Sequence, residues 1–190
     1  MTAARPVLTF DLDGVICRPP FGINPGRGIA KRREGEGTRS LLWRTERWRY
    51  LGRKPMPGAR EGFTSLASGF DCKIVSARSA EAASLTARWF ERHIGIIPEL
   101  HLRPDYREKP AQFKTRKIVE LGAIAHFEDD AHTAKWVAEL IPQVFLIDWW
   151  RNRWFDAANV HRVKEILDAA PFLAASAGSG VQLANEGAPD

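Results

Sequence analysis

Short apolar runs alternate with longer amphipathic segments along most of this chain. The runs have the length and composition of buried strands and occur at Val7–Phe10, Cys72–Val75, Leu100–Leu102, Ile124–Phe127 and Val144–Ile147. The segments between them have helical periodicity, with Trp89 and Trp136 on apolar faces that are expected to face the core. Such alternation favours a mainly parallel sheet with helices on both faces, because right-handed crossovers place them there. We expect an α/β, Rossmann-like three-layer sandwich with a five-stranded sheet.

The expected helices fit a single domain that carries one insertion. They run from Pro57 to about Leu66, from Ser79 to His93, from Lys114 to Leu121, from Ala131 to Leu140 and from Ala158 to Ala169. Residues 1–173 would form the domain, and the insertion at about 18–55 combines a Gly- and Pro-rich stretch with an expected helix at Ser40–Leu51. The tail 174–190 is rich in Ala, Gly and Ser, and we expect it to be flexible.

Two aspartates one residue apart follow the first expected strand. In extended backbone Asp11 and Asp13 point to the same side, and Gly14 allows a sharp turn directly after them. Two neighbouring carboxylates resist joint ionisation unless a cation lies between them or one keeps a proton. The pair therefore indicates a site with a chemical function. For this segment taken alone, the alternative is an Asp-Gly turn exposed to solvent.

Polar groups also follow two later strands. Ser76-Ala77-Arg78 places a hydroxyl and a cation after the second strand, and Glu128-Asp129-Asp130 places three carboxylates after the fourth. Lys109 and Lys114 precede that fourth strand. In an open α/β sheet the carboxyl ends of the strands share one edge, where such folds bind ligands.

The order Asp-x-Asp, Ser, Lys, Asp-Asp resembles the haloacid dehalogenase (HAD) superfamily, over about Val7 to Trp154. The resemblance implies that Asp11 is the nucleophile that becomes an aspartyl phosphate. Asp13 would be the general acid and base, and Ser76 would hydrogen-bond a phosphoryl oxygen. The chain is thus expected to be a phosphohydrolase with a small cap formed by its insertion.

The same resemblance implies a metal site and a lysine. Asp129, assisted by Asp130, would join Asp11 and the backbone carbonyl of Asp13 around Mg²⁺, an ion that prefers hard oxygen ligands. The spacing of Lys114 resembles the 5'-nucleotidase-like branch of the superfamily and is favoured for the catalytic lysine. Lys109, in a Lys-Pro pair typical of members with larger caps, is the alternative, and Glu128 receives no role.

Composition sets the class of protein but not its substrate. The chain has 190 residues, 44% of them hydrophobic and 27% charged, as in a soluble globular protein. Cys17 and Cys72 provide neither a disulfide framework nor zinc-site spacing, so we expect reduced thiols in a cytoplasmic protein. No signal-peptide pattern and no apolar stretch of about 20 residues occurs, so no membrane partner is expected. The oligomeric state is not determined by these patterns.

The insertion concentrates the positive charge of the chain. Between Arg18 and Lys54 it contains eleven basic and three acidic residues, which would attract polyanions. Arg44 and Arg47 on its expected helix, together with Ala77 and Arg78, are the candidate substrate-binding residues. A basic helix face that only contacts solvent is the alternative.

Several substrates fit a basic site with nearby tryptophans. A nucleoside monophosphate is favoured, because the lysine spacing, the Ser76-Ala77-Arg78 segment and the element Asp148–Arg153 resemble the nucleotidase-like branch. A phosphorylated nucleic-acid end or another small phosphorylated metabolite is the alternative within this class. In a different class, the chain would be a non-catalytic nucleic-acid-binding module on the same scaffold.

Overall fold

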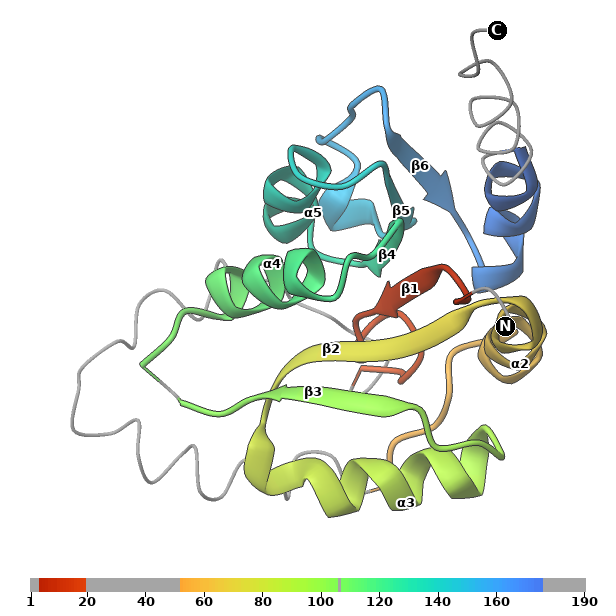
Figure 1. Cartoon of the computed structure of the whole chain (residues 1–190), viewed down its shortest axis with the longest axis vertical. Coiled ribbons are helices and arrows are strands. Elements are labelled where there is room, and N and C mark those ends of the chain that lie inside the picture. The colour runs from red at the N-terminus through yellow and green to blue at the C-terminus, as the bar shows by residue number, and fades with distance from the viewer. Residues whose placement is uncertain (1–3, 20–51, 106, 176–190) are drawn as a thin grey trace, which may run out of the picture.

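The fold is built around a parallel sheet of six strands. The computed structural model describes residues 4–19, 52–105 and 107–175. The strand order is β3-β2-β1-β4-β5-β6 (Figure 1), with bounds β1 Val7–Phe10, β2 Asp71–Ser79, β3 Glu99–Arg103, β4 Ala125–Glu128, β5 Gln143–Ile147 and β6 Val160–Val163. The chain builds outward from β1 in one direction and then outward from β4 in the other. The switch point between β1 and β4 is where folds of this kind bind ligands.

Helices cover both faces of the sheet (Figure 1). The α-helices are α2 Ala59–Gly69, α3 Ala83–His93, α4 Pro110–Glu120 and α5 Ala131–Ala138, and the 3-10 helices are η4 Ala80–Ala82, η5 Trp150–Asn152 and η6 Ile166–Ala169. One apolar core packs α2, α3 and η6 against one face, and a second packs α4 and α5 against the other. The three-layer arrangement expected from the sequence is confirmed.

Alternating side chains in the strands supply both cores. In β5, Phe145 and Ile147 belong to the core on the side of α2 and α3, whereas Val144 and Leu146 belong to the core on the side of α4 and α5. A strand buried on both faces reads as a continuous apolar run, and this is why Val144–Ile147 was recognisable in the sequence.

The expectation of five strands was wrong, because the segment expected as a helix at Ala158–Ala169 contains β6. Val160 pairs with Val144 and Val163 with Ile147 in parallel register. Val160 belongs to the core on the side of α4 and α5 and Val163 to the core on the side of α2 and α3, so the two buried side chains lie on opposite faces of the sheet, as the alternation of a strand requires for residues three apart. Pairing with β5 thus decides the conformation of a segment whose local pattern also fits a helix.

The expectation for Ser79 was confirmed and the one for Trp136 was wrong. The Ser79 hydroxyl caps the helical segment that ends at His93, because it accepts a hydrogen bond from the backbone amide of Glu81 in η4, and α3 follows η4 directly at Ala83. Trp89 is buried as expected and donates its indole N–H to the carbonyl of Arg53 at 2.7 Å, but Trp136 is half exposed rather than in the core.

Some expectations fall outside the described residues. These are the insertion helix at Ser40–Leu51 with Arg44 and Arg47, and residues 176–190 of the expected tail; residues 170–175, before them, are helical. Among the described residues, none of the helices has both the length and the apolar character needed to cross a bilayer.

The close packing of α2 on η6 generates a prediction. A Cβ added to Gly62 would lie 2.8 Å from Ile166 Cβ, and a Cβ at Gly69, in the same helix, would meet no atom within 4 Å. We expect Gly62→Ala to lower the free energy of unfolding by about 1–3 kcal/mol, because the backbone must shift. Gly69→Ala should raise it by up to about 1 kcal/mol through helix propensity. Urea unfolding measures both, and equal effects would contradict the close approach.

Candidate active site

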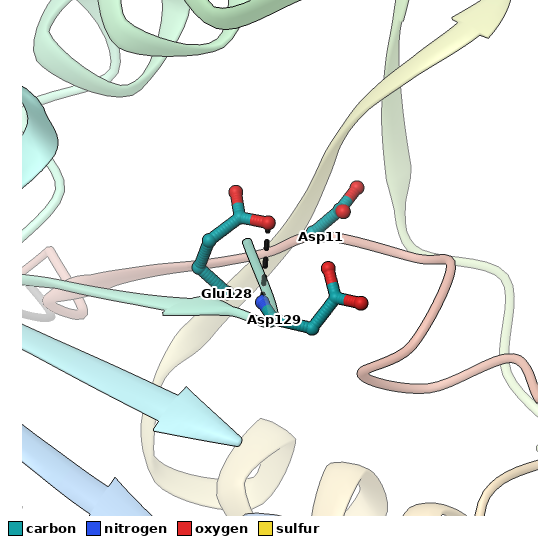
Figure 2. A group of neighbouring side chains, drawn as sticks. All are labelled: Asp11, Glu128 and Asp129. Atoms are coloured by element: carbon teal, nitrogen blue, oxygen red, sulfur yellow. Dashed lines mark hydrogen bonds between the residues drawn. The ribbon is translucent and has the colours of Figure 1, made fainter. Parts of the chain in front are cut away.

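Three carboxylates converge where β1 and β4 end. Asp11 directly follows β1, Glu128 is the last residue of β4 and Asp129 comes next. Because β1 and β4 are parallel neighbours, with the Asp11 amide donating to the Phe127 carbonyl at 2.8 Å, their carboxyl ends meet. Each of the three side chains places an oxygen within 4.8 Å of the other two (Figure 2). All three residues are buried.

Lys114 on α4 supplies positive charge to this cluster. Its Nζ lies 2.6 Å from Asp11 Oδ2 and 2.8 Å from Glu128 Oε2, and the residue is 3% exposed. Burial alone lowers the pKa of Lys114, but the charges of Asp11 and Glu128 outweigh burial and raise it. Lys109 is exposed and occupies the N-cap position of α4, so the structure brings Lys114, not Lys109, to Asp11.

The Glu128 carboxylate has several hydrogen-bond and ion-pair partners that no pattern in the sequence had indicated. Besides Lys114, its carboxylate accepts hydrogen bonds from the backbone amides of Asp129 and Asp130 at 3.1 and 3.2 Å. His126 Nε2 lies 3.3 Å from it, and His126 Nδ1 lies 3.0 Å from Thr9 Oγ1. Burial acts to raise the pKa of Glu128, but the Lys114 charge and the His126 contact outweigh it, so the pKa lies well below its ordinary value. Glu128 is therefore the ionised partner of Lys114.

The ionised forms of the other two carboxylates, Asp11 and Asp129, are less favoured than that of Glu128. Burial, together with the charge of Glu128, raises the pKa of Asp11 to about 7, although Lys114 opposes the rise. Burial and the charges of Glu128 and Asp11 also raise the pKa of Asp129 well above its ordinary value. A divalent cation would favour ionisation of both, and a set of carboxylate oxygens suits Mg²⁺. Asp11, Glu128 and Asp129 together form a group of carboxylates that could hold such an ion.

Asp13 belongs to a separate group of charges beside this cluster. Arg78 Nε and Nη2 donate to its two carboxylate oxygens at 2.9 and 2.7 Å, and Arg53 Nη1 donates at 3.3 Å. Burial acts to raise the pKa of Asp13, but the Arg78 guanidinium outweighs it and holds that pKa below its usual value. Asp13 is therefore a carboxylate at neutral pH, and both edge donors of Arg78 are engaged with it.

The segment after β5 contacts the residues of the site. Arg151 in η5 forms an ion pair with Asp129. Asn152 Nδ2 donates to the carbonyls of Asp129 and Ile147 at 3.0 and 2.7 Å, and so joins the ends of β4 and β5. The indole of Trp149 donates to the Gly14 carbonyl at 3.2 Å, which joins the same segment to the turn after Asp13.

The other site residues predicted from the sequence, Ser76, Ala77 and Asp130, lie outside the three-carboxylate cluster. Ser76 is buried in β2, one of the two neighbours of β1, and its hydroxyl lies near the Arg78 amide; half-buried Ala77 lies between them. Asp130 caps α5, because its Oδ2 accepts from the amide and hydroxyl of Thr133 at 3.1 and 2.8 Å. The side chains of Asp13 and Asp130 therefore lie outside the three-carboxylate cluster.

Comparison with known proteins identifies the architecture. No family model and no curated protein matches the sequence. Among solved structures, a haloacid dehalogenase-like hydrolase from Streptococcus pneumoniae superposes with a TM-score of 0.62 at 14% identity, covering 91% of this chain and 100% of that one. A haloacid dehalogenase-like family hydrolase from Xanthomonas campestris gives 0.59 at 11% identity, with 93% and 99% covered. The chain has the HAD fold.

A third solved structure has the same fold and a phosphatase name. The D,D-heptose 1,7-bisphosphate phosphatase from B. bronchiseptica, in complex with magnesium and phosphate, superposes with a TM-score of 0.53 at 8% identity, covering 90% of this chain and 99% of that one. At such identities the likeness concerns the HAD fold alone. These neighbours give no support to the expected 5'-nucleotidase-like branch.

Sequence reasoning gave no role to three residues that the fold brings to this edge: Glu128, His126 and Arg53. An acidic residue directly before Asp129 on a buried strand was a usable signal for Glu128, since a buried carboxylate requires a partner. Arg151 entered only as part of the element Asp148–Arg153, and its pairing with Asp129 had no signal, because the two residues are distant in sequence. A separate pocket of about 420 Å³ lies at the opposite ends of β1 and β2, lined partly by Arg5, and contains none of the site residues.

The ion pair of Arg78 with Asp13 generates a prediction about stability. We expect Arg78→Met to lower the free energy of unfolding at pH 7 by about 1–3 kcal/mol, because the half-buried Asp13 loses its main partner, a buried guanidinium group. The pKa of Asp13 is lowered in the folded state, so the contribution of the pair is present above the unfolded pKa of about 4 and is lost as pH falls below it.

Urea unfolding of parent and variant between acid and neutral pH measures this effect. The matched control is Arg153→Met, which breaks the exposed pair of Arg153 with Asp148 and should cost less than about 1 kcal/mol. A difference between parent and Arg78→Met that stays constant from acid to neutral pH would show that Asp13 does not carry the effect.

Proposed function

We propose that this protein is a metal-dependent phosphohydrolase that acts through an aspartyl-phosphate intermediate. The observation that carries the proposal is the contact of Lys114 Nζ with Asp11 Oδ2 at 2.6 Å, inside a buried carboxylate cluster at the switch point of a HAD fold. A carboxylate beside an ammonium group is a nucleophile that an anionic phosphoester can approach. The HAD neighbour named as a phosphatase, in complex with magnesium and phosphate, supports the same reaction class.

The proposed reaction has two steps, with Asp11 and Asp13 in different roles. An Asp11 oxygen forms a bond to phosphorus while the bond to the leaving oxygen breaks, and that oxygen takes up the proton of the Asp13 carboxyl group, which becomes a carboxylate. A water molecule then attacks phosphorus, gives a proton to Asp13 and releases phosphate and the Asp11 carboxylate. The low pKa of Asp13 in the free protein favours the base role, and its acid role rests on the family resemblance.

Mg²⁺ is the proposed cofactor, held by Asp11 and Asp129. Bound there, the ion would favour the ionised form of Asp11 and reduce the repulsion between carboxylates and substrate. Lys114 stabilises negative charge on Asp11, while Glu128 keeps the ammonium group in position through its own contact with Nζ. Ser76 is the proposed hydroxyl donor to a phosphoryl oxygen.

The substrate proposal remains the one made from the sequence. A nucleoside monophosphate is the first candidate, with Arg44 and Arg47 as recognition residues in the insertion, and a phosphorylated nucleic-acid end is the second. A panel of nucleoside monophosphates, sugar phosphates and phosphorylated oligonucleotides distinguishes them by kcat/KM. Salt-sensitive binding of oligonucleotides without turnover of any phosphoester would instead favour a binding module.

The nucleophile is tested by hydrolysis of a chromogenic aryl phosphate with and without Mg²⁺. We expect Asp11→Asn to lower kcat by about 10³-fold or more, because removal of a nucleophile eliminates the covalent route. Asp156→Asn, an exposed substitution of the same kind, should leave the rate unchanged. Undiminished activity in Asp11→Asn would refute the covalent mechanism.

The base role of Asp13 has a separate readout. In Asp13→Asn the first step should still proceed with an aryl phosphate, because its good leaving group requires little protonation, but water attack should be slow. We therefore expect the acid-quenched variant to gain the mass of one phosphoryl group, and the double variant Asp11→Asn, Asp13→Asn to gain none. A rapid variant without any covalent adduct would contradict the role given to Asp13.

A further inference from the structure

Arg151 is placed at the candidate active site by rigid local structure. It lies in η5 between the half-buried Trp149 and the fully buried Asn152, which donate to the carbonyls of Gly14 and Asp129, respectively. The Arg151 side chain is 9% exposed and forms an ion pair through Nη2 with Asp129 Oδ2. Its guanidinium group is therefore fixed on one member of the carboxylate cluster.

One donor of this guanidinium group is unused. Among the residues that the structure describes, Arg151 Nε is a buried nitrogen without a hydrogen-bond partner. In a guanidinium group the Nε–H and one Nη2–H are parallel and lie on the same edge. The unused N–H therefore lies on the edge of the guanidinium group that also carries Nη2, the nitrogen in contact with Asp129.

In Arg78, both nitrogens of the corresponding guanidinium edge have an acceptor. Its Nε and Nη2 donate to both oxygens of Asp13, so the whole edge is used within the protein. Lys114 likewise contacts Asp11 and Glu128 at once. Arg151 differs from both, because its Nη2 contacts Asp129 while its Nε is a buried donor for which the described residues supply no acceptor.

We propose that Arg151 Nε binds an oxygen of the substrate's phosphoryl group while Nη2 remains on Asp129, which makes Arg151 a substrate-binding residue. The ligand class rests on the proposed function, since an anionic tetrahedral oxygen group is what a phosphohydrolase holds at this place. An arginine edge can hold two oxygens from different groups, and a charge-assisted bond to phosphate is about twice as strong as a neutral one. Asp129, in contact with both the arginine and the metal ion, would set the distance between them.

The test measures binding rather than turnover, by isothermal titration of orthophosphate into the full chain at saturating Mg²⁺. We expect Arg151→Ala to weaken orthophosphate binding by about tenfold or more. Arg151→Lys keeps the charge but lacks the parallel Nε–H, and we expect it to recover less than half of the loss on a logarithmic scale. Arg153→Ala, which removes the same charge from a neighbouring exposed site, should stay within about twofold of the parent.

A second titration, of Mg²⁺ alone, separates substrate binding from positioning of Asp129. We expect the Mg²⁺ affinity of Arg151→Ala to be equal to or higher than that of the parent, because a competing cation has left Asp129. A parallel fall in Mg²⁺ and orthophosphate affinity, or unchanged orthophosphate affinity in Arg151→Ala, would overturn the proposal while Asp11-dependent hydrolysis still stands. A parent that neither hydrolyses phosphoesters nor binds orthophosphate would overturn both.

Discussion

Burial of several carboxylates at one edge of the sheet requires positive charge in direct contact with them, and this constraint determines how the edge is assembled. Asp11, Glu128 and Asp129 lie together in low-dielectric surroundings, where an unpaired charge is costly. Lys114 reaches them from α4 and Arg151 from η5. Elements that are distant in the sequence are thus joined by the charges that the site requires.

Glu128 and Asp11 share the positive charge of Lys114, but their pKa values shift in opposite directions. Glu128 keeps the charge of Lys114 in place and is itself supported by His126 and by two backbone amides. Asp11 shares the Lys114 ammonium group with Glu128, and its pKa is raised by burial and by the charge of Glu128. In the proposed reaction, an added cation would favour the ionised form of Asp11.

The sequence could place much of this edge because the signals are local. Asp11, Asp13, Ser76 and Asp129 each follow a recognisable apolar run within or at the end of a strand, and parallel strands bring their carboxyl ends together. The choice between Lys109 and Lys114 stayed open, since both precede the same strand. The helical expectation for the segment of β6 and the core position expected for Trp136 failed, because edge pairing and solvent exposure depend on neighbours that a local pattern does not contain.

The sequence by itself determined the layered α/β architecture and the strand ends at which acidic and hydroxyl groups gather, because hydrophobic periodicity and strand direction are properties of neighbouring residues. Only the tertiary structure decided the partners: Lys114 on Asp11 and Glu128, Arg78 on Asp13, and Arg151 on Asp129 with one donor left over. Ion pairs between elements depend on distances of a few ångströms set by packing of the whole chain. No spacing along the sequence encodes those distances.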